Sequence, residues 1–301
     1  MSSRNELQAG TLVTLTIVRE VTPNGFYLSN GDEEVLLHYS QIAGPNRIEV
    51  NQRIEVFIYY DTEDRIAATM KRPLLVLGEV GLLEVVDIHP HIGTFLEMGL
   101  GRHLLLPFKE QPEQQQLRPQ VGDRIYVILA NDRVGRLIAK LAGEDELAPL
   151  TFHAPTAWKN QWLEARVYNP MEEGTFVICD GGVLGFGAIG MIHASERISI
   201  LRVGEQLKAR VTFVREDGRI NLSMRPLKEV GMEEDAEKIL AYLQATQEQA
   251  MPYSDQTTAD IISEKFNISK SAFKRALGKL MKQCLIYQEG NMTYLKQDKD
   301  K

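Results

Sequence analysis

The chain has 301 residues, 44% hydrophobic and 25% charged, which is the balance of an ordinary soluble globular protein and excludes a disordered one. Its formal net charge of −7 argues against an indiscriminate nucleic-acid binder, because phosphate contacts leave a basic footprint. The sequence shows no signal peptide and no run of the ~20 apolar residues that span a membrane, and its two cysteines fit no metal or redox spacing, so we expect a cytoplasmic protein without metal or cofactor.

The first seventy residues predict five short strands with turn residues between them. Residues 11–19 alternate along two faces, and the turns Pro23-Asn24-Gly25 and Asn30-Gly31-Asp32 precede the next two strands. Five strands in about 70 residues are typical of a small closed barrel. We therefore predict a five-stranded OB-fold barrel over 1–73, with later strands at 26–28, 34–37, 53–59 and 65–69.

The sequence pattern of this first barrel recurs twice along the chain. A repeat of this length indicates repeated domains. Gly25-Phe26-Tyr27-Leu28 corresponds to Gly93-Thr94-Phe95-Leu96 and to Gly174-Thr175-Phe176-Val177. We predict a second, degenerate barrel and a third barrel, joined by an acidic, proline-containing linker that we expect to be exposed. The predicted bounds are 74–142 for the second barrel, 143–157 for the linker and 158–227 for the third barrel.

After Pro226 the apolar spacing becomes helical. One helix is predicted within 232–249, a second is expected to start at a cap on Thr257, and a third is expected to start at a cap on Ser269. Two short strands around a Glu289-Gly290-Asn291 turn complete a winged-helix domain, predicted over 228–301.

The third copy carries the closest resemblance to a known domain. Its Gly174-Thr175-Phe176, Ile192-His193-Ala194-Ser195, Val203-Gly204 and Asp217-Gly218-Arg219-Ile220 resemble the RNA-binding OB-fold domain of ribosomal protein S1. Three such domains before a winged helix resemble the conserved virulence factor B family of bacterial RNA-binding regulators. The resemblance implies a mainly β, multidomain, non-catalytic protein with an α+β C-terminal domain. It would bind single-stranded RNA and regulate gene expression after transcription, including virulence genes.

In the S1 family the RNA face combines two aromatic side chains with a histidine, an aspartate and an arginine, which stack on bases and contact phosphates. No copy here has the whole set, because the first aromatic is missing throughout, Pro107 replaces the second histidine and Arg215 the third aspartate. We therefore expect copies one and three to bind better than copy two. The resemblance implies RNA contacts at Tyr27, His38, Asp61 and Arg65, at Phe95, Asp132 and Arg136, and at Phe176, His193 and Arg219.

Other interpretations stay open. The aromatic residues could be barrel wall, since strands favour aromatics for packing. The third predicted helix of the winged-helix domain is basic and could contact nucleic acid or a partner through Lys270, Lys274, Arg275 and Lys279. The chain could then be a scaffold that docks on a protein or the ribosome, or, less favoured, a regulator that binds duplex DNA. The string Gly185–Gly190 matches G-x-G-x-x-G, but a strand is expected to follow it, which argues against a dinucleotide site.

Overall fold

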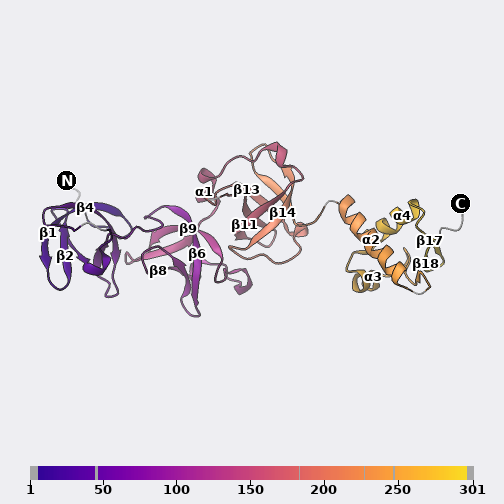
Figure 1. Cartoon of the computed structure of the whole chain (residues 1–301), viewed down its shortest axis with the longest axis horizontal. Helices are drawn as coiled ribbons and strands as arrows, with labels where there is room; N and C mark the ends of the chain where they lie inside the picture. Colours follow the sequence, from indigo (N-terminus) through magenta and orange to yellow (C-terminus); the bar gives the residue numbers. More distant parts are fainter. Residues whose placement is uncertain (1–5, 45–46, 183, 227, 247, 297–301) are drawn as a thin grey trace. The chain divides into compact units, whose positions relative to one another are not determined.

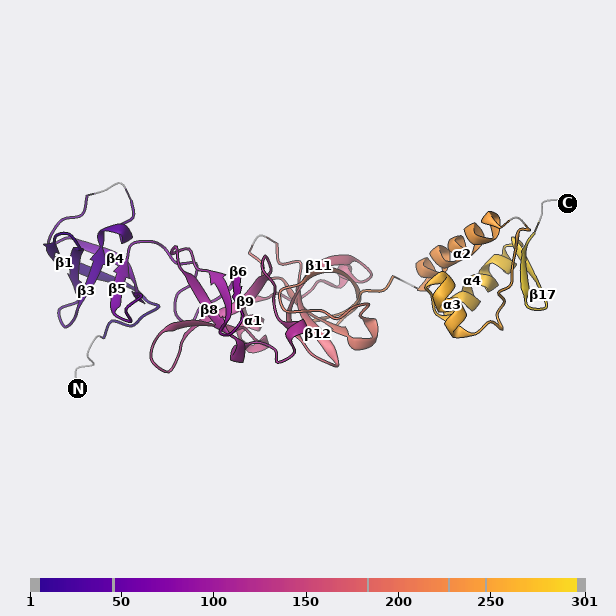
Figure 2. The same cartoon turned by 90° about the horizontal axis from the view of Figure 1, so that it is seen from below.

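The computed structural model describes residues 6–44, 47–182, 184–226, 228–246 and 248–296. The chain forms two compact units, Met1–Arg225 and Pro226–Lys301, which are drawn in Figures 1 and 2. Within the described residues no helix is both long and apolar enough to cross a membrane.

The first copy folds as the predicted closed barrel. The apolar residues that alternate along its strands fill the interior, where Ile17, Leu28 and Leu37 are completely buried. A parallel pair between the third and fifth strands closes the barrel in the order β1-β2-β3-β5-β4. The strands are β1 (Leu12–Val21), β2 (Gly25–Ser29), β3 (Glu34–His38), β4 (Arg53–Tyr60) and β5 (Ile66–Thr69).

The glycine that opens the second strand has a steric reason in the first two copies. Gly25 and Gly93 have φ of 145° and 149°, and a Cβ on either would lie 2.2 Å from a carbonyl oxygen of the adjacent strand. Only glycine accepts both the backbone angle and the close approach. The repeated glycine thus marks where one strand starts against its neighbour, one residue from the buried side chain and two from the outward aromatic.

The second copy is a five-stranded sheet, and its predicted closure into a barrel is not confirmed. Its order is β10-β9-β6-β7-β8, and no hydrogen-bonded ladder joins β8 to β10 among the described residues, although the two strands lie side by side. One local cause is Pro107 at the end of β8, which has no backbone N–H to donate to a ladder. The strands are β6 (Val80–His89), β7 (Gly93–Glu97), β8 (His103–Pro107), β9 (Arg124–Asn131) and β10 (Leu137–Leu141).

Most of the segment 143–157 is exposed, but parts of it are folded and two of its side chains are buried. It forms helix α1 (Glu144–Leu147) and two 3-10 turns, η4 (Ala148–Leu150) and η5 (Thr156–Trp158). Leu147 is completely buried in an apolar cluster that also contains Tyr126 of β9 and residues of the third barrel. Apolar burial therefore fastens this segment between the second and third sheets.

The third copy is a closed barrel with the same order as the first, β11-β12-β13-β15-β14. Gly185–Gly190 leads into a strand, as expected, and not into a helix. Among the contacts that join this barrel to the second sheet, Arg202 pairs with Asp123 at 2.9 Å, and the Tyr126 hydroxyl donates to the Gly185 carbonyl. The strands are β11 (Trp162–Pro170), β12 (Gly174–Cys179), β13 (Ala188–His193), β14 (Gln206–Val214) and β15 (Ile220–Ser223).

The second unit has the expected winged-helix pattern, with α2 packed against α4. Ser269 caps α4 through its side chain, as predicted. The cap predicted at Thr257 is wrong by one residue: Thr258 is the N-cap, and the Thr257 hydroxyl accepts the backbone N–H of Ser254. The two-residue strand β16 was not expected from the sequence. The elements are α2 (Lys228–Ala245), β16 (Ala250–Met251), α3 (Ala259–Phe266), α4 (Lys270–Lys282), β17 (Ile286–Glu289) and β18 (Met292–Leu295).

Candidate nucleic-acid interface

A register shift in the first strand of each copy places one exposed side chain opposite the repeated aromatic residue. The shifts lie between Ile17 and Arg19, between Val85 and Asp87, and between Val167 and Asn169. A bulge of this kind re-aims the side chains beyond it. The resulting pairs across the strands are Arg19 with Tyr27, Asp87 with Phe95, and Asn169 with Phe176.

In the first barrel this pair joins a cation to an aromatic ring. The guanidinium carbon of Arg19 lies 4.3 Å from the centre of the Tyr27 ring, and Glu34 holds the guanidinium by an ion pair at 2.7 Å. Arg65 lies on the hairpin that follows β4, and its hydrogen bonds to Asp61 raise its pKa. The half-buried Tyr27 therefore lies against the Arg19 guanidinium, an arrangement that suits base stacking beside a phosphate contact.

The aspartates predicted for the RNA face organise turns. Asp61 accepts the backbone N–H groups of Glu63 and Arg65 on one oxygen, and the Nε and Nη2 of Arg65 on the other at 3.0 and 2.9 Å. Burial would raise the pKa of Asp61, but these hydrogen bonds outweigh it and hold that pKa below its ordinary value. The aspartate thus fixes the arginine at the hairpin between β4 and β5, with Arg65 still largely exposed.

The second copy repeats this turn with Asp132 and Arg136, whose Nε donates to the carboxylate at 3.0 Å. Its aromatic surroundings differ, because the exposed residue opposite Phe95 is the acidic Asp87. Pro107 takes the place of the histidine. Asp87 would repel a phosphate at the place where the first barrel carries the cation of Arg19.

The two predicted histidines have the same geometry. His38 and His193 are exposed N-caps of the 3-10 turns η1 (Tyr39–Gln41) and η6 (Ala194–Glu196). Each Nδ1 accepts the backbone N–H of the serine two residues on, at 3.2 Å, and contacts that serine's hydroxyl. Because Nδ1 accepts, the ring hydrogen lies on Nε2, the nitrogen that these bonds leave outward.

In the third copy other parts of the chain engage two of the three predicted residues. Phe176 packs in the cluster around Leu147, with its ring 6.2 Å from that of Tyr168. Arg219 forms ion pairs with Glu144 of α1 and with Asp217. The third copy resembles an S1 domain most in its sequence. Its aromatic residue and its arginine are nevertheless both held by contacts within the chain.

Three of the four basic residues proposed on α4 have contacts within the second unit. Lys279 is only 19% exposed and pairs with Glu233 at 2.8 Å, while Lys274 lies 3.9 Å from Asp255. Lys270 donates to the Gln256 carbonyl at 3.4 Å, and Arg275 is exposed. A role of α4 in contacting nucleic acid or a partner therefore stays a prediction.

Sequence reasoning missed Arg19. Its position, eight residues before Tyr27, carries no motif, and the bulge that aligns it with Tyr27 is visible only in the register. No group of three or more histidine, cysteine, aspartate or glutamate side chains with metal-binding geometry occurs among the residues described.

Comparisons with known proteins fit this architecture. Family models match along most of the chain, and together they define tandem S1-like domains followed by a winged helix, which are domain types of nucleic-acid-binding proteins. The models are an S1 domain (9–71), the CvfB first S1-like domain (80–140), the second domain of virulence regulatory factor CvfB (148–226) and the CvfB-like winged helix domain (237–295).

The chain belongs to the conserved virulence factor B family, which confirms the resemblance. It is 30% identical to conserved virulence factor B of Staphylococcus epidermidis over 90% of each chain. It is 41% identical to the uncharacterized protein YitL of Bacillus subtilis, over 97% of this chain and 95% of that protein. A solved multidomain protein with nucleic acid binding domains from Streptococcus pneumoniae is 28% identical, with a TM-score of 0.60 over 96% of this chain and 98% of that one.

Proposed function

We propose that the protein binds single-stranded RNA in the bacterial cytoplasm without catalysing a reaction, and regulates gene expression after transcription, including virulence factors. The observation that carries the proposal is the Arg19–Tyr27 pair on the first barrel, in which a guanidinium lies over a half-buried ring. Rings and guanidinium planes both stack on unpaired bases, and arginines also contact phosphates. Membership of the virulence factor family supports the regulatory part.

The first barrel is the principal site in this proposal. Copy two presents Asp87 beside its aromatic residue, and copy three has Phe176 and Arg219 engaged by the segment around α1. His38 would add a hydrogen-bond donor at the edge of the first face. Binding to this one face would be of modest affinity and sensitive to salt, as the net charge of −7 requires.

Replacement of Tyr27 tests the proposal. Tyr27→Ala should weaken binding of fluorescent single-stranded RNA by about 1–3 kcal/mol, because one stacked base contributes about that much. Tyr27→Phe should keep most of the affinity, since the ring remains. The measurement is fluorescence anisotropy with homopolymer RNAs at about 50 and about 200 mM salt.

Phe95→Ala is the matched control, since it removes the corresponding ring opposite Asp87 and should cost less affinity. Wild-type protein that binds no RNA at the lower salt would contradict the proposed function. Equal affinity of wild type and a folded Tyr27→Ala variant would instead move the site away from the first barrel.

A further inference from the structure

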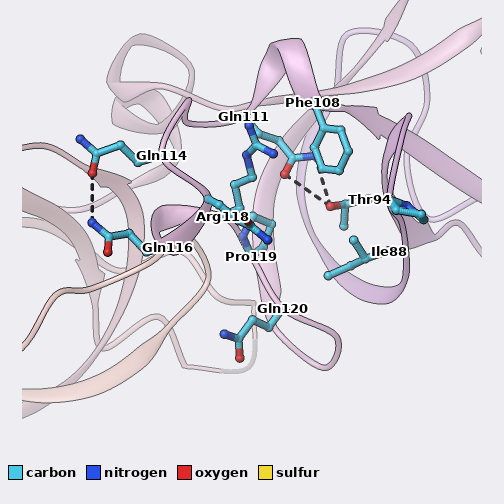
Figure 3. A pocket seen from close by; sticks show the side chains of 11 residues that line it. Ile88, Thr94, Phe108, Gln111, Gln114, Gln116, Arg118, Pro119 and Gln120 are labelled. Carbon is cyan, nitrogen blue, oxygen red and sulfur yellow. Dashed lines mark hydrogen bonds between the residues drawn. The ribbon is translucent and has the colours of Figure 1, made fainter.

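One pocket of the second copy is lined by Ile88, Thr94 and residues between Phe108 and Gln120. Its volume is about 910 Å³, within the range of about 300–1,000 Å³ that is usual for small-molecule sites. Five of its eleven lining residues are glutamines, and Arg118 is the only charged one. The lining is shown in Figure 3: Gln114 and Gln116 lie on one side, and Phe108, Thr94 and Ile88 lie on the other.

The inner wall of this pocket is held in a fixed shape. Gln111 is 8% exposed, and its amide nitrogen donates to the Leu106 carbonyl at 2.8 Å and to the Thr94 hydroxyl at 3.2 Å. Arg118 donates to the carbonyls of Pro112 and Glu113, while its guanidinium lies 4.6 Å from the centre of the Phe108 ring. These hydrogen bonds therefore stabilise the loop that follows β8. The Arg118 guanidinium is engaged by backbone carbonyls of the same loop.

The outer wall offers amides for binding. Gln115 and Gln120 are exposed and have no side-chain hydrogen bond among the described residues, and Gln116 is bonded only to the neighbouring Gln114, at 3.2 Å. An amide presents a donor and an acceptor side by side, which matches the edge of a nucleobase. A lining without a carboxylate does not suit a metal ion, and its one cation, Arg118, is already engaged by backbone carbonyls and does not favour an isolated phosphate.

The same place differs in the other two copies. The residue that ends the 3-10 turn after the third strand is Ile42 in copy one, Gln111 in copy two and Arg197 in copy three. In copy one the corresponding pocket has apolar and aromatic side chains in its lining, together with the charged Glu20, Arg47 and Glu49. In copy three the Arg197 side chain crosses the site and donates to Thr175 and to the carbonyls of the preceding hairpin.

We infer that the glutamine-lined pocket of the second copy binds one unpaired nucleobase of the RNA and reads its edge through Gln116 and Gln120. The inference rests on the proposed RNA binding and gives the second copy a role that its aromatic face lacks. The stacked Phe108 and Arg118 form a planar wall beside the base, and the outer glutamines supply donors and acceptors.

The first experiment compares the affinities of wild type and a Gln116→Ala/Gln120→Ala variant for the four RNA homopolymers. The variant should bind the best-bound homopolymer about tenfold more weakly and should lose most of the preference among bases, because amide contacts discriminate between base edges. Gln161→Ala is the control: this glutamine bonds the Ala157 carbonyl on the third barrel, and its loss should leave the preference unchanged.

The second experiment needs no RNA binding by the barrels. Each of the four nucleosides is added to isotope-labelled full-length protein, and at least one should shift the NMR signals of the glutamine side-chain amides of the pocket. Tyr27→Ala should keep these shifts. Wild type that binds no RNA but shows them would contradict the proposed function and support the pocket.

The inference is overturned if no nucleoside shifts the pocket amides. It is equally overturned if RNA binds but the double variant keeps the wild-type base preference. Shifts caused by a short uncharged peptide, and by no nucleoside, would assign the pocket to a protein partner and reject the base.

Discussion

The residue opposite each repeated aromatic side chain distinguishes three faces that have the same backbone arrangement. Arg19, Asp87 and Asn169 occupy the same place in the ladder and give a basic, an acidic and a neutral setting for the ring beside them. A charge a few ångströms from a bound phosphate changes the affinity more than a distant net charge does, because solvent and salt screen the latter. Under the proposed function, local pairing across the strands would therefore decide which copy binds RNA.

The aspartate at the β9–β10 turn should stabilise the fold in a pH-dependent way. Burial would raise the pKa of Asp132, but hydrogen bonds from the backbone of Arg136 and Val134 and from the Arg136 side chain hold that pKa below its ordinary value. A carboxylate with a lowered folded-state pKa stabilises the fold above the unfolded-state pKa of about 3.9, and the contribution is lost as the pH falls through the folded-state value.

Asp132→Ala should accordingly lower the free energy of unfolding by about 1–2 kcal/mol at neutral pH, and the deficit should shrink below about pH 4. Urea denaturation followed by circular dichroism at both pH values measures it. Glu113→Ala, which removes an exposed acid from the same domain, controls for the change in charge. A deficit that stays constant with pH would refute the carboxylate as its source.

At the scale of elements, α1 is the feature that sequence reasoning could not place. Its Glu144-Asp145-Glu146 run and the prolines nearby indicate an exposed connection, and only the folded chain shows that the following Leu147 is buried beside Phe176. The strands and their turns were predictable because alternation and glycine positions are local signals. The packing of Phe176 was not predictable from the sequence, because it depends on contacts with α1, a segment about 30 residues away.

The ion pair between Glu144 and Arg219 should limit RNA binding by the third barrel. Glu144→Gln frees the arginine for a phosphate, so RNA affinity should rise and log K should depend on log salt more steeply by about 0.7. A salt titration of RNA binding gives this slope. Asp145→Asn makes the same change in charge on the same helix, and similar effects of both variants would attribute the gain to net charge alone.

At the scale of the first unit, the second and third sheets are coupled by a partly buried ion pair. Arg202 donates two hydrogen bonds to Asp123, at 2.9 and 3.1 Å, and also pairs with Glu205. The side chains of Arg202 and Asp123 are 24% and 11% exposed, so water screens this pair less than a surface pair. The contact should make the two sheets more cooperative in unfolding.

Arg202→Met should destabilise the third barrel by about 1–3 kcal/mol, because it leaves a partly buried carboxylate without its cation. Tryptophan fluorescence during urea denaturation reports this barrel, since both tryptophans of the chain, Trp158 and Trp162, precede or begin its first strand. Lys208→Met breaks an exposed pair with Glu164 and should have little effect. Equal shifts for the two variants would argue against the coupling.

The fixed imidazoles of His38 and His193 have a consequence for what can lie beside them. Since serine groups hold each Nδ1, the outward edge of the ring offers a hydrogen and no lone pair. A ligand that approaches there has to present an acceptor, such as a phosphate or ribose oxygen, and an amino group meets hydrogen against hydrogen. The two histidines would thus favour the oxygen atoms of a nucleic-acid backbone as neighbours and disfavour an ammonium group.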